Sequence, residues 1–210
     1  MRTRLLDLAL VLPALLLLSP LLLLVGVCVK LTSRGPAVFA QQRVGRGGRR
    51  FRLYKFRSMR VAPAGCGDLV TGRDDPRITP VVRWLRRTKL DELPQLWNVA
   101  RGDMSLVGPR PEVPRYAACY TPQQRQMLEV RPGITDPATL AFRHEEDLLA
   151  AVPADEREAY YLREVLPRKL ELNREYLERR GVWSDLGVIA RTLAALLPRP
   201  GHAYGKAESS

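Results

Sequence analysis

The pattern of apolar and polar positions divides the chain into a membrane-like beginning and a mixed remainder. Residues 8–29 contain no charged side chain, and as a helix rising about 1.5 Å per residue they are long enough to cross a bilayer. Beyond Lys30 the sequence changes to short segments that are typical of strands. From residue 81 onward, apolar residues recur at helical spacing between turns. The pattern predicts an apolar N-terminal helix followed by a mixed domain.

The apolar run has three interpretations. A secretory signal needs a shorter apolar core and a cleavage site of small residues, which residues 8–29 do not provide. The run is then a helix that spans the membrane or one that enters and returns to the same side. Pro20 predicts a kink because it cannot donate a backbone hydrogen bond, and the Ser19 hydroxyl can satisfy a freed carbonyl. Since Arg4 and Lys30 make both flanks basic, the positive-inside rule favours neither topology.

A β-hairpin is predicted after the apolar run. Strand-like segments at 37–44 and 51–59 flank a glycine-rich turn at 45–49. In an extended strand, alternate side chains share one face: Phe51, Leu53, Lys55 and Arg57. This face places two cations beside an apolar patch, which suits either a binding site or a solvated, charged edge strand.

The rest of the chain reads as helices. Five are predicted: from 81 toward 90, from about Asp91 to Gly102 with Leu93, Leu96 and Trp97 on one face, over 112–130, from Pro167 to about 180, and a last helix capped by Ser184 or Asp185. The predicted fold class is α+β: an N-terminal membrane helix, a small hairpin or sheet element and several amphipathic helices in one compact domain.

Charge changes this picture because it is unevenly distributed. The chain of 210 residues has a net charge of +12, and its first 110 residues carry 20 basic and 7 acidic groups. Nine of the basic groups lie between Arg34 and Arg60, where no acidic residue occurs. Such a block indicates an anionic partner such as nucleic acid, acidic lipid or phosphate. Few aromatic residues interleave it, which disfavours stacking on nucleic-acid bases.

Cysteine and histidine narrow the chemistry further. The three cysteines form no Cys-x-x-Cys pair, and the two histidines, His144 and His202, are far apart. These counts argue against a disulfide framework, a zinc site and a histidine-dependent triad. Any catalysis would therefore depend on carboxylates and basic groups.

Asp91 and Glu92 are the most suggestive chemical feature. One interpretation is structural, because acidic side chains in a first turn stabilise the positive end of a helix. The cations Arg86 and Lys89 just before the pair favour another interpretation. An ionised carboxylate beside a bound phosphate can act as a nucleophile, and a second carboxylate can help to hold Mg²⁺. Neither a P-loop nor a complete dinucleotide fingerprint is present, so a nucleotide would be bound in another way.

Five motifs then occur in order along the chain. They are Lys-Phe-Arg-Ser-Met at 55–59, Asp-Pro-Arg-Ile-Thr at 75–79, Arg86 with Leu-Asp-Glu-Leu-Pro-Gln-Leu-Trp-Asn-Val at 90–99, Gly-Asp-Met-Ser-Leu-Val-Gly-Pro-Arg-Pro-Glu at 102–112, and Arg-Pro-Gly-Ile-Thr at 131–135. With them the chain strongly resembles the bacterial sugar transferase family, the monotopic polyprenyl-phosphate phosphoglycosyl transferases, in their minimal catalytic form. The resemblance extends from the apolar run to Asp185.

The resemblance implies an activity. Such enzymes move a phospho-sugar from a UDP-sugar to polyprenyl (undecaprenyl) phosphate and release UMP, by a ping-pong route with a covalent aspartyl intermediate and Mg²⁺. This is the first membrane step of exopolysaccharide, lipopolysaccharide or other glycoconjugate synthesis. The resemblance further implies a re-entrant helix, contact with membrane lipid, and a place at the bacterial inner (cytoplasmic) membrane with the active site on the cytoplasmic face. Nucleic acid is not expected as a partner, and a homodimer is left open.

Individual residues match the family's motifs. Asp91 matches the nucleophile and Glu92 its partner carboxylate, and both are implied as ligands of Mg²⁺. Lys55, Arg57 and Arg86 fall where the family gathers phosphate-binding cations. The other implied substrate-binding and membrane-kink residues are Arg110 and Pro111 in the nucleotide-side loop, Asp185 near the C-terminus, and Ser19 with Pro20 in the membrane helix. The implied organisation is a re-entrant membrane helix with its flanks at 1–33, a catalytic domain at 34–198 and a disordered tail at 199–210.

Two positions depart from the family's pattern. Asp136 and Pro137 follow the last motif where many members carry glycine, and Asn173 stands where some place an aspartate. Two other functions compete with the transferase. One is a membrane-anchored basic protein that binds nucleic acid, and the other is a non-catalytic assembly protein that retains only the fold. The intact carboxylate pair argues against the latter.

Overall fold

The computed structural model describes residues 2–32, 35–57 and 80–197. Its helices are α1 (Arg2–Thr32), α2 (Pro80–Arg87), α3 (Gln95–Arg101), α4 (Pro114–Ala117), α5 (Pro137–Ala141), α6 (Glu145–Ala150), α7 (Arg157–Tyr160), α8 (Leu166–Glu178) and α9 (Val182–Leu196), with shorter turns η1 (Arg46–Gly48), η2 (Leu90–Glu92), η3 (Gln124–Glu129) and η4 (Tyr161–Val165). Its strands are β1 (Val38–Val44), β2 (Arg50–Phe56), β3 (Ser105–Val107) and β4 (Gly133–Thr135). This combination confirms the predicted α+β class. The motif at 75–79 and the predicted tail at 199–210 lie outside the described residues.

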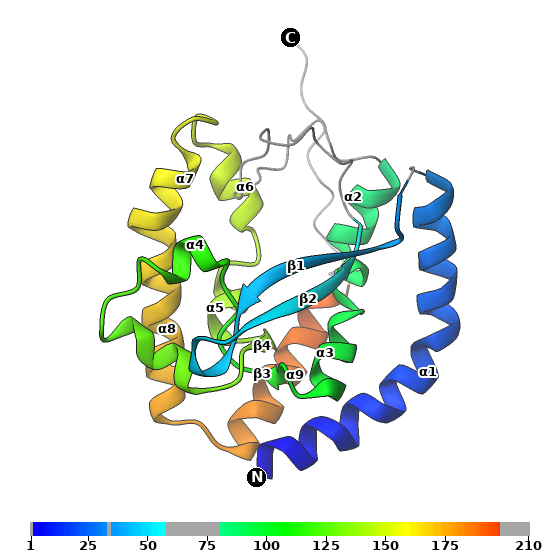
Figure 1. The fold of residues 1–210 in the computed structure, drawn as a ribbon, viewed down its shortest axis with the longest axis horizontal. Coiled ribbons are helices and arrows are strands. Elements are labelled where there is room, and N and C mark those ends of the chain that lie inside the picture. The colour runs from blue at the N-terminus through cyan, green and yellow to red at the C-terminus, as the bar shows by residue number, and fades with distance from the viewer. Residues whose placement is uncertain (1, 33–34, 58–79, 198–210) are drawn as a thin grey trace.

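The predicted hairpin is confirmed, and it lies across the centre of the molecule (Figure 1). β1 and β2 pair antiparallel, from Val38 opposite Phe56 to Val44 opposite Arg50. Gly47 at the tip has a φ of +68°, a left-handed conformation that glycine adopts without strain. β2 buries side chains on both faces, because Leu53 on the predicted face and Phe56 on the opposite face belong to two different apolar clusters. The alternation therefore predicted the burial of Leu53 but not that of Phe56.

α1 is an apolar helix that bends along its length, as Figure 1 shows. Its first half contributes Val11 to one buried cluster, and its second half contributes Val29 to another. The Ser19 hydroxyl donates to the Leu16 carbonyl at 2.8 Å, and that carbonyl lies four residues before Pro20, which has no N–H to offer it. Among the described residues, α1 is the one helix long and apolar enough to cross a membrane.

Both ends of α1 are held by the rest of the chain. Near the start, Arg4 donates to the last carbonyls of α3. One turn later, the buried Asp7 carboxylate accepts a hydrogen bond from the Ser105 hydroxyl at 3.0 Å and another from the backbone of β3 at 2.9 Å. Near the other end, the Val29 carbonyl accepts from Arg57 at 3.4 Å. Both ends of the helix are therefore attached to the same domain, and residues between them pack against its apolar clusters.

A parallel pair of three-residue strands, which the sequence analysis does not predict, joins two of the motif loops. The register of β3 and β4 places Ser105 opposite Gly133. Just beyond it the two backbones lie so close together that a Cβ atom on Gly133 would be 2.1 Å from the nitrogen of Gly108. A side chain at this position would have to displace backbone atoms. The close approach fixes the loop that carries Arg110 against the loop at 131–133.

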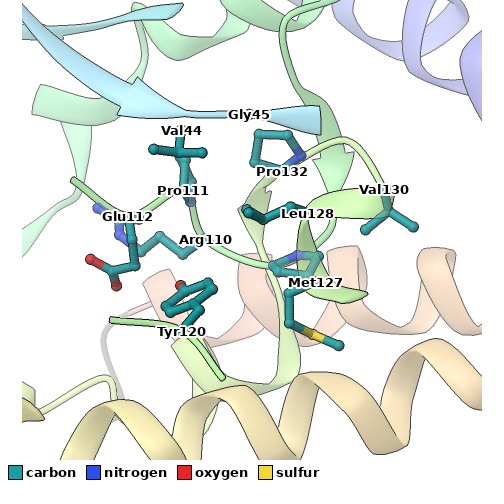
Figure 2. A pocket seen from close by; sticks show the side chains of 11 residues that line it. Val44, Gly45, Arg110, Pro111, Glu112, Tyr120, Met127, Leu128, Val130 and Pro132 are labelled. Carbon is teal, nitrogen blue, oxygen red and sulfur yellow. The ribbon is translucent and has the colours of Figure 1, made fainter. Parts of the chain in front are cut away.

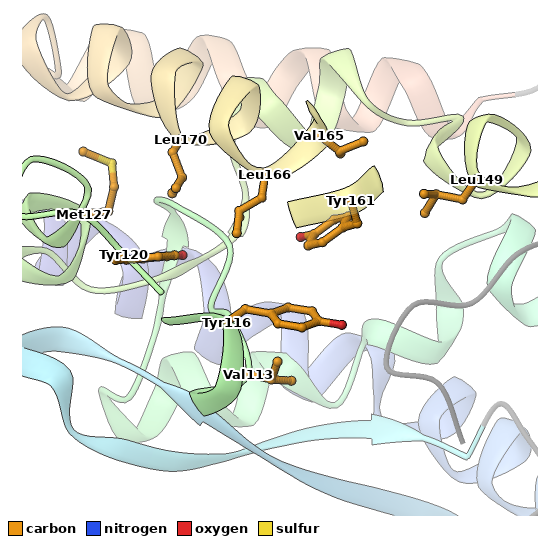
Figure 3. Close-up of a cluster of buried hydrophobic side chains, with 9 residues drawn as sticks. All are labelled: Val113, Tyr116, Tyr120, Met127, Leu149, Tyr161, Val165, Leu166 and Leu170. Carbon is orange, nitrogen blue, oxygen red and sulfur yellow. The ribbon is translucent and has the colours of Figure 1, made fainter. Parts of the chain in front are cut away.

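A further apolar cluster lies between α4 and α8 (Figure 3). Its buried members are Val113, Tyr116, Tyr120, Met127, Leu149, Tyr161, Val165, Leu166 and Leu170. The prediction of a single helix over 112–130 is wrong, because the chain forms α4 and η3 with a turn between them. Pro122 in that stretch lacks an N–H and disfavours helical geometry in the residue before it. The apolar residues are buried, but from two short elements.

The predicted start of the helix after the carboxylate pair also needs correction. The chain forms the tight turn η2 first, and α3 begins only at Gln95 with Pro94 as its N-cap. Leu96 is buried, but Trp97 is 55% exposed and does not share the buried face. The end was predicted correctly, since Gly102 adopts a φ of +94° and closes α3.

Candidate active site

Asp91 and Glu92 lie in η2, the turn that joins α2 to α3. Lys89 precedes this turn with a φ of +55°, a left-handed conformation that costs a non-glycine residue about 1–2 kcal/mol. Asp91 is only 7% exposed, and its Oδ1 atom has no hydrogen-bond partner among the described residues. A buried carboxylate oxygen without a partner is uncommon and needs a functional explanation.

Glu92 has a partner that holds both of its oxygens. Arg110, from the loop after β3, donates from Nη2 to Oε1 at 2.7 Å and from Nη1 to Oε2 at 3.1 Å. Burial alone would raise the pKa of Glu92, but the charge and the hydrogen bonds of Arg110 outweigh it and lower that pKa to about 2. Glu92 is therefore a stable anion, and the guanidinium has the two-pronged geometry that also suits phosphate.

Asp91 has the opposite electrostatic character. Burial, followed by the negative charge of Glu92, raises the pKa of Asp91 to about 6. The positive charges of Lys89, Lys55 and Arg86 act in the other direction and limit this increase. Two adjacent carboxyl groups thus titrate far apart, and Asp91 is the one whose ionised form is less stabilised by its surroundings.

Lys55 brings a cation to the pair from β2. Its ammonium group lies 5.7 Å from the centre of the Phe39 ring on the neighbouring strand. Burial and the like charge of Arg43 lower the pKa of Lys55, whereas Asp91 raises it. The strand therefore contributes a partly desolvated cation within electrostatic range of Asp91.

Asn98 fixes the hairpin to the helix that follows the pair. Its side chain is fully buried on α3 and bonds to the backbone of β2. Oδ1 accepts from the Tyr54 N–H at 3.0 Å, and Nδ2 donates to the Arg52 carbonyl at 2.7 Å. Because Tyr54 is next to Lys55, these two bonds set the position of the Lys55 backbone relative to η2.

Three other predicted substrate-binding residues have partners of their own. Arg86 forms an ion pair with Glu146 at 2.5 Å, and its charge still acts on Asp91. The Pro111 carbonyl accepts from Arg43 at 3.0 Å. Arg57 donates to backbone carbonyls near the end of α1, among other contacts. Their roles in binding substrate stay predictions.

Asp185 is buried in the first turn of α9 and connects three elements. Its carboxylate accepts from Arg180 at 3.1 Å and from the Tyr176 hydroxyl, both close to the end of α8. Arg180 also donates to the Val107 carbonyl of β3 at 2.8 Å. Because α9 begins after Gly181, its N-cap, neither predicted cap residue occupies that position. These contacts give Asp185 a structural task, and its predicted substrate contact stays a prediction.

The departure at Asp136 has a structural explanation. Asp136 is fully buried as the N-cap of α5, and its carboxylate accepts from the Thr139 N–H and hydroxyl, each at 2.8 Å. Pro137 then occupies the first turn, where a missing N–H is tolerated. The pair starts a helix at the end of β4.

Sequence reasoning missed a set of polar residues that the fold brings together beside the pair. They are Arg43 on β1, Glu112 after β3, Glu145 and Glu146 on α6, Tyr161 in η4 and Lys169 on α8. With Arg86 and Arg110 they line a cavity of about 180 Å³. Except for Glu112, which closes a motif, these residues carry no local signal because they meet only through tertiary packing.

A second hollow lies on the other side of the loop that carries Arg110 (Figure 2). Mainly apolar side chains line it, including Val44, Tyr120 and Met127. Its volume of about 10 Å³ suits roughly one water molecule. Of these two cavities, the polar one has room for part of a ligand.

The residues present fit a hard divalent cation. Within the described residues, no group of three or more histidine, cysteine, aspartate and glutamate side chains could hold a metal. Asp91 and Glu92 stay the predicted ligands of Mg²⁺. Mg²⁺ commonly uses one or two carboxylates and takes its other ligands from phosphates and water. The unpartnered Oδ1 of Asp91 is an available donor.

The apolar helix α1 is compatible with membrane association, and the mixed domain attached to it carries the carboxylate pair. The model of one family, described as bacterial sugar transferase, matches residues 1–199. The chain therefore belongs to the bacterial sugar transferase family, which confirms the resemblance seen in the motifs.

Named relatives agree with this assignment. The chain is 37% identical over 195 residues to the UDP-glucose:undecaprenyl-phosphate glucose-1-phosphate transferase of Escherichia coli (strain K12), covering 89% of this chain and 38% of that protein. It is 36% identical over 201 residues to a protein of the same name from Caulobacter vibrioides, covering 94% and 70%. It is also 36% identical over 184 residues to the UDP-N-acetylgalactosamine-undecaprenyl-phosphate N-acetylgalactosaminephosphotransferase of Aeromonas hydrophila, covering 86% and 40%. The chain thus spans well under half the length of two of these relatives.

Proposed function

We propose that this chain transfers a sugar 1-phosphate from a UDP-sugar to undecaprenyl phosphate and releases UMP. The observation that carries the proposal is the Asp91 carboxylate, which is buried, has an unpartnered oxygen and lies within electrostatic range of Lys55, Lys89 and Arg86. The names of the relatives support the same reaction and the same two substrates.

The reaction proceeds in two displacements. In the first, an Asp91 carboxylate oxygen attacks the phosphorus that carries the sugar, and the bond from that phosphorus to the bridging oxygen breaks. UMP leaves with the bridging oxygen and its electron pair, and the phospho-sugar stays on Asp91 as an acyl phosphate. In the second, an oxygen of undecaprenyl phosphate attacks the same phosphorus and the bond to Asp91 breaks. The products are undecaprenyl diphosphate sugar and the free carboxylate.

The chain's own residues set the conditions for the first displacement. Asp91 is the nucleophile, and with a pKa of about 6 it is mainly ionised at neutral pH. Lys55 and Arg86 offset negative charge on the diphosphate. Arg110 orients Glu92 by a bidentate contact and also presents donors to the nucleotide-side phosphate.

Asp91 and Glu92 would hold the cofactor, Mg²⁺. When bound, Mg²⁺ supplies positive charge that reduces the repulsion between the attacking carboxylate and the diphosphate. Glu92 remains able to contribute although Arg110 occupies both of its oxygens, because each carboxylate oxygen has a second lone pair.

α1 is proposed as a re-entrant membrane helix. Arg4 and Asp7 hold its beginning and Arg57 its end against one domain, so a membrane entered by the bend would have both ends on the same side. The undecaprenyl phosphate acceptor is a lipid with its phosphate at the membrane surface. This arrangement supports a location at the bacterial inner membrane, with Asp91 and Glu92 on the cytoplasmic face where UDP-sugars are made.

Release of UMP is the direct test. Purified protein in lipid nanodiscs is incubated with a panel of UDP-sugars, first without and then with undecaprenyl phosphate. Without acceptor, we expect about one UMP to be released per enzyme molecule. With acceptor, we expect UMP release to continue. We also expect a phospho-sugar adduct on the wild-type enzyme that is absent from Asp91→Asn. Absence of UMP with every UDP-sugar, or full activity of Asp91→Asn, would contradict the proposal.

A further inference from the structure

Neither Asp91 nor Glu92 lines the polar cavity of about 180 Å³, which adjoins the carboxylate pair through other residues. Two of its lining residues act directly on the pair: Arg110 binds Glu92, and the charge of Arg86 reaches Asp91. From there the cavity extends to α6 and α8, where Glu145 and Lys169 lie. Arg86 and Arg110 therefore connect this cavity to the carboxylate pair, where the sugar-bearing phosphorus is proposed to bind.

The cations of the cavity are already neutralised. Each of the four has a carboxylate partner: Lys169 with Glu145 at 2.6 Å, Arg86 with Glu146 at 2.5 Å, Arg110 with Glu92 at 2.7 Å, and Arg43 with Glu112 at 3.9 Å. Among the described lining residues, none of these cations is left without an acidic partner for a second anionic group. At the end formed by α6 and α8, where Lys169 is paired with Glu145 and the apolar Leu149 also lines the wall, the cavity therefore does not favour a negative charge. Arg86 and Arg110, proposed to face the diphosphate, lie where the cavity adjoins the carboxylate pair.

The innermost pair is well ordered by its surroundings. Lys169 is 8% exposed, and its ammonium group also lies 5.4 Å from the centre of the Tyr161 ring. The Tyr161 hydroxyl donates to Glu112 at 2.7 Å. Figure 3 shows the Tyr161 and Leu149 side chains that bound this end of the cavity. Donors and acceptors are therefore presented in fixed positions on a rigid wall.

Such a wall suits hydroxyl groups. Each sugar hydroxyl both donates and accepts, so it can bind a carboxylate and an ammonium group that are already paired with each other. A site built to bind hydroxyls discriminates strongly, because an ill-matched ligand leaves buried polar groups without partners.

We propose that this cavity holds the sugar ring of the UDP-sugar, that Glu145 and Lys169 determine which sugar is accepted, and that the accepted class is neutral hexoses rather than hexuronic acids. The inference rests on the proposed function, because the phosphorus attacked by Asp91 is bonded directly to the sugar. The nucleotide is one phosphate further away.

Two single variants test the proposal because they change the cavity in opposite ways. Glu145→Gln removes the negative charge and leaves Lys169 without its anion. Its kcat/KM for neutral UDP-hexoses should fall at least tenfold, while its relative use of UDP-glucuronate should rise at least tenfold. Lys169→Met leaves Glu145 uncompensated, so the same preference should move further against UDP-glucuronate. Inhibition by UMP should be unchanged in both variants.

The control is Glu171→Gln on α8, the helix that also carries Lys169. Glu171 forms an exposed ion pair with Arg174 outside the cavity, so all UDP-sugars should react as with the wild-type enzyme. Thermal unfolding of each variant detects a folding defect. The ratio of kcat/KM for two UDP-sugars measures selectivity independently, because the fraction of folded enzyme cancels in that ratio.

Two results would overturn the inference. If both variants change kcat/KM equally for every UDP-sugar, Glu145 and Lys169 do not determine which sugar is accepted. If they weaken inhibition by UMP, the cavity holds the nucleotide. Failure of the proposed function is distinguishable from both results, because the wild-type enzyme would then release no UMP from any UDP-sugar.

Discussion

The two adjacent carboxylates owe their different behaviour to one arginine. Arg110 approaches Glu92 in a bidentate manner, while Asp91, one residue earlier, receives only longer-range attraction from cations. The result is a firm anion beside a carboxylate whose pKa is raised to about 6. Separation of neighbouring pKa values in this way is a common means of assigning different tasks to similar groups.

The raised pKa of Asp91 predicts that the site lowers the stability of the fold. When a group has a higher pKa in the folded state than in the unfolded state, the free energy of unfolding falls as pH rises through the folded-state pKa, here about 6. Asp91→Asn should therefore abolish UMP release and yet raise the free energy of unfolding at pH 8, by on the order of 1–3 kcal/mol. The measurement is thermal unfolding of both proteins in the same detergent without added metal.

The pH dependence of that gain provides the control. Near pH 4, close to the ordinary pKa of an aspartate, Asp91 is protonated in the folded protein and the two proteins should unfold at similar temperatures. An equal gain at both pH values would mean that the amide stabilises the fold for reasons unrelated to charge.

The same titration should limit the first displacement. Below pH 6 the Asp91 carboxylate becomes protonated and loses its nucleophilic form, so the rate of single-turnover UMP release should fall about tenfold for each unit of pH. Rapid-quench measurements without acceptor lipid would show this acid limb. A limb centred at the ordinary aspartate value near 4 would show that burial does not act on Asp91 as described.

The bidentate contact predicts that lysine cannot replace Arg110. Arg110→Lys retains the charge but loses one of the two hydrogen bonds to Glu92, and hydrogen bonds to charged groups contribute about 1.5–3 kcal/mol. The kcat/KM for UMP release should fall by roughly tenfold to a hundredfold. Arg174→Lys, which breaks a similar bidentate contact to Glu171 on the exposed face of α8, should leave activity unchanged.

At the scale of elements, the site depends on the attachment of α3 to β2. Asn98→Ala removes the bonds to the Tyr54 N–H and the Arg52 carbonyl, and each buried group left unpaired costs about 1–3 kcal/mol. We expect a lower unfolding temperature together with reduced activity, since Lys55 loses its fixed place beside η2. Gln126→Ala on the exposed side of η3 is the matched control and should change neither property. Normal activity in a destabilised Asn98→Ala protein would separate Asn98 from the site.

Local patterns predicted the elements whose causes are local. The hairpin follows from alternation around a glycine turn, and Gly102 ends α3 as expected. The parallel pair β3 and β4 escaped prediction because three-residue strands have no visible period and form only when distant loops meet. Pro122 is a local signal for the break between α4 and η3, and the prediction of a single helix over 112–130 did not take it into account.

The candidate site divides in the same way. Asp91, Glu92 and Arg110 stand inside motifs and were found from them, and the structure places Arg110 on Glu92. Glu145 on α6 and Lys169 on α8 are 24 positions apart in the sequence and meet only in the folded chain. No spacing rule connects such a pair, so tertiary structure was required.

For the whole molecule, the path of α1 predicts a topology. Both ends of the helix are held by the same domain, and its outward leucines are exposed, for example Leu17 at 81%. Cysteines introduced at Thr3 and at Leu31, in a chain whose own cysteines are replaced by serine, should both resist a membrane-impermeant maleimide in intact cells. Both should react once the cells are opened.

Opposite labelling of the two positions would mean that the helix spans the membrane. An Asp7→Asn variant sharpens the test, because loss of its charge weakens the contact with Ser105 while leaving the bend unchanged. If the cysteine introduced at position 3 reacts from outside the cell in this variant, the contact between Asp7 and Ser105 is needed, in addition to the bend, to keep both ends of the helix on one side.

The close contact between Gly108 and Gly133 has a kinetic consequence. It joins the loop that carries Arg110 to its neighbour so tightly that the backbone has little freedom left to lose when a ligand arrives. Most of the entropic cost of ordering this loop is therefore met during folding and not when a ligand binds. An alanine at position 133 would push the two backbones apart, and a ligand would then have to order the loop each time it binds.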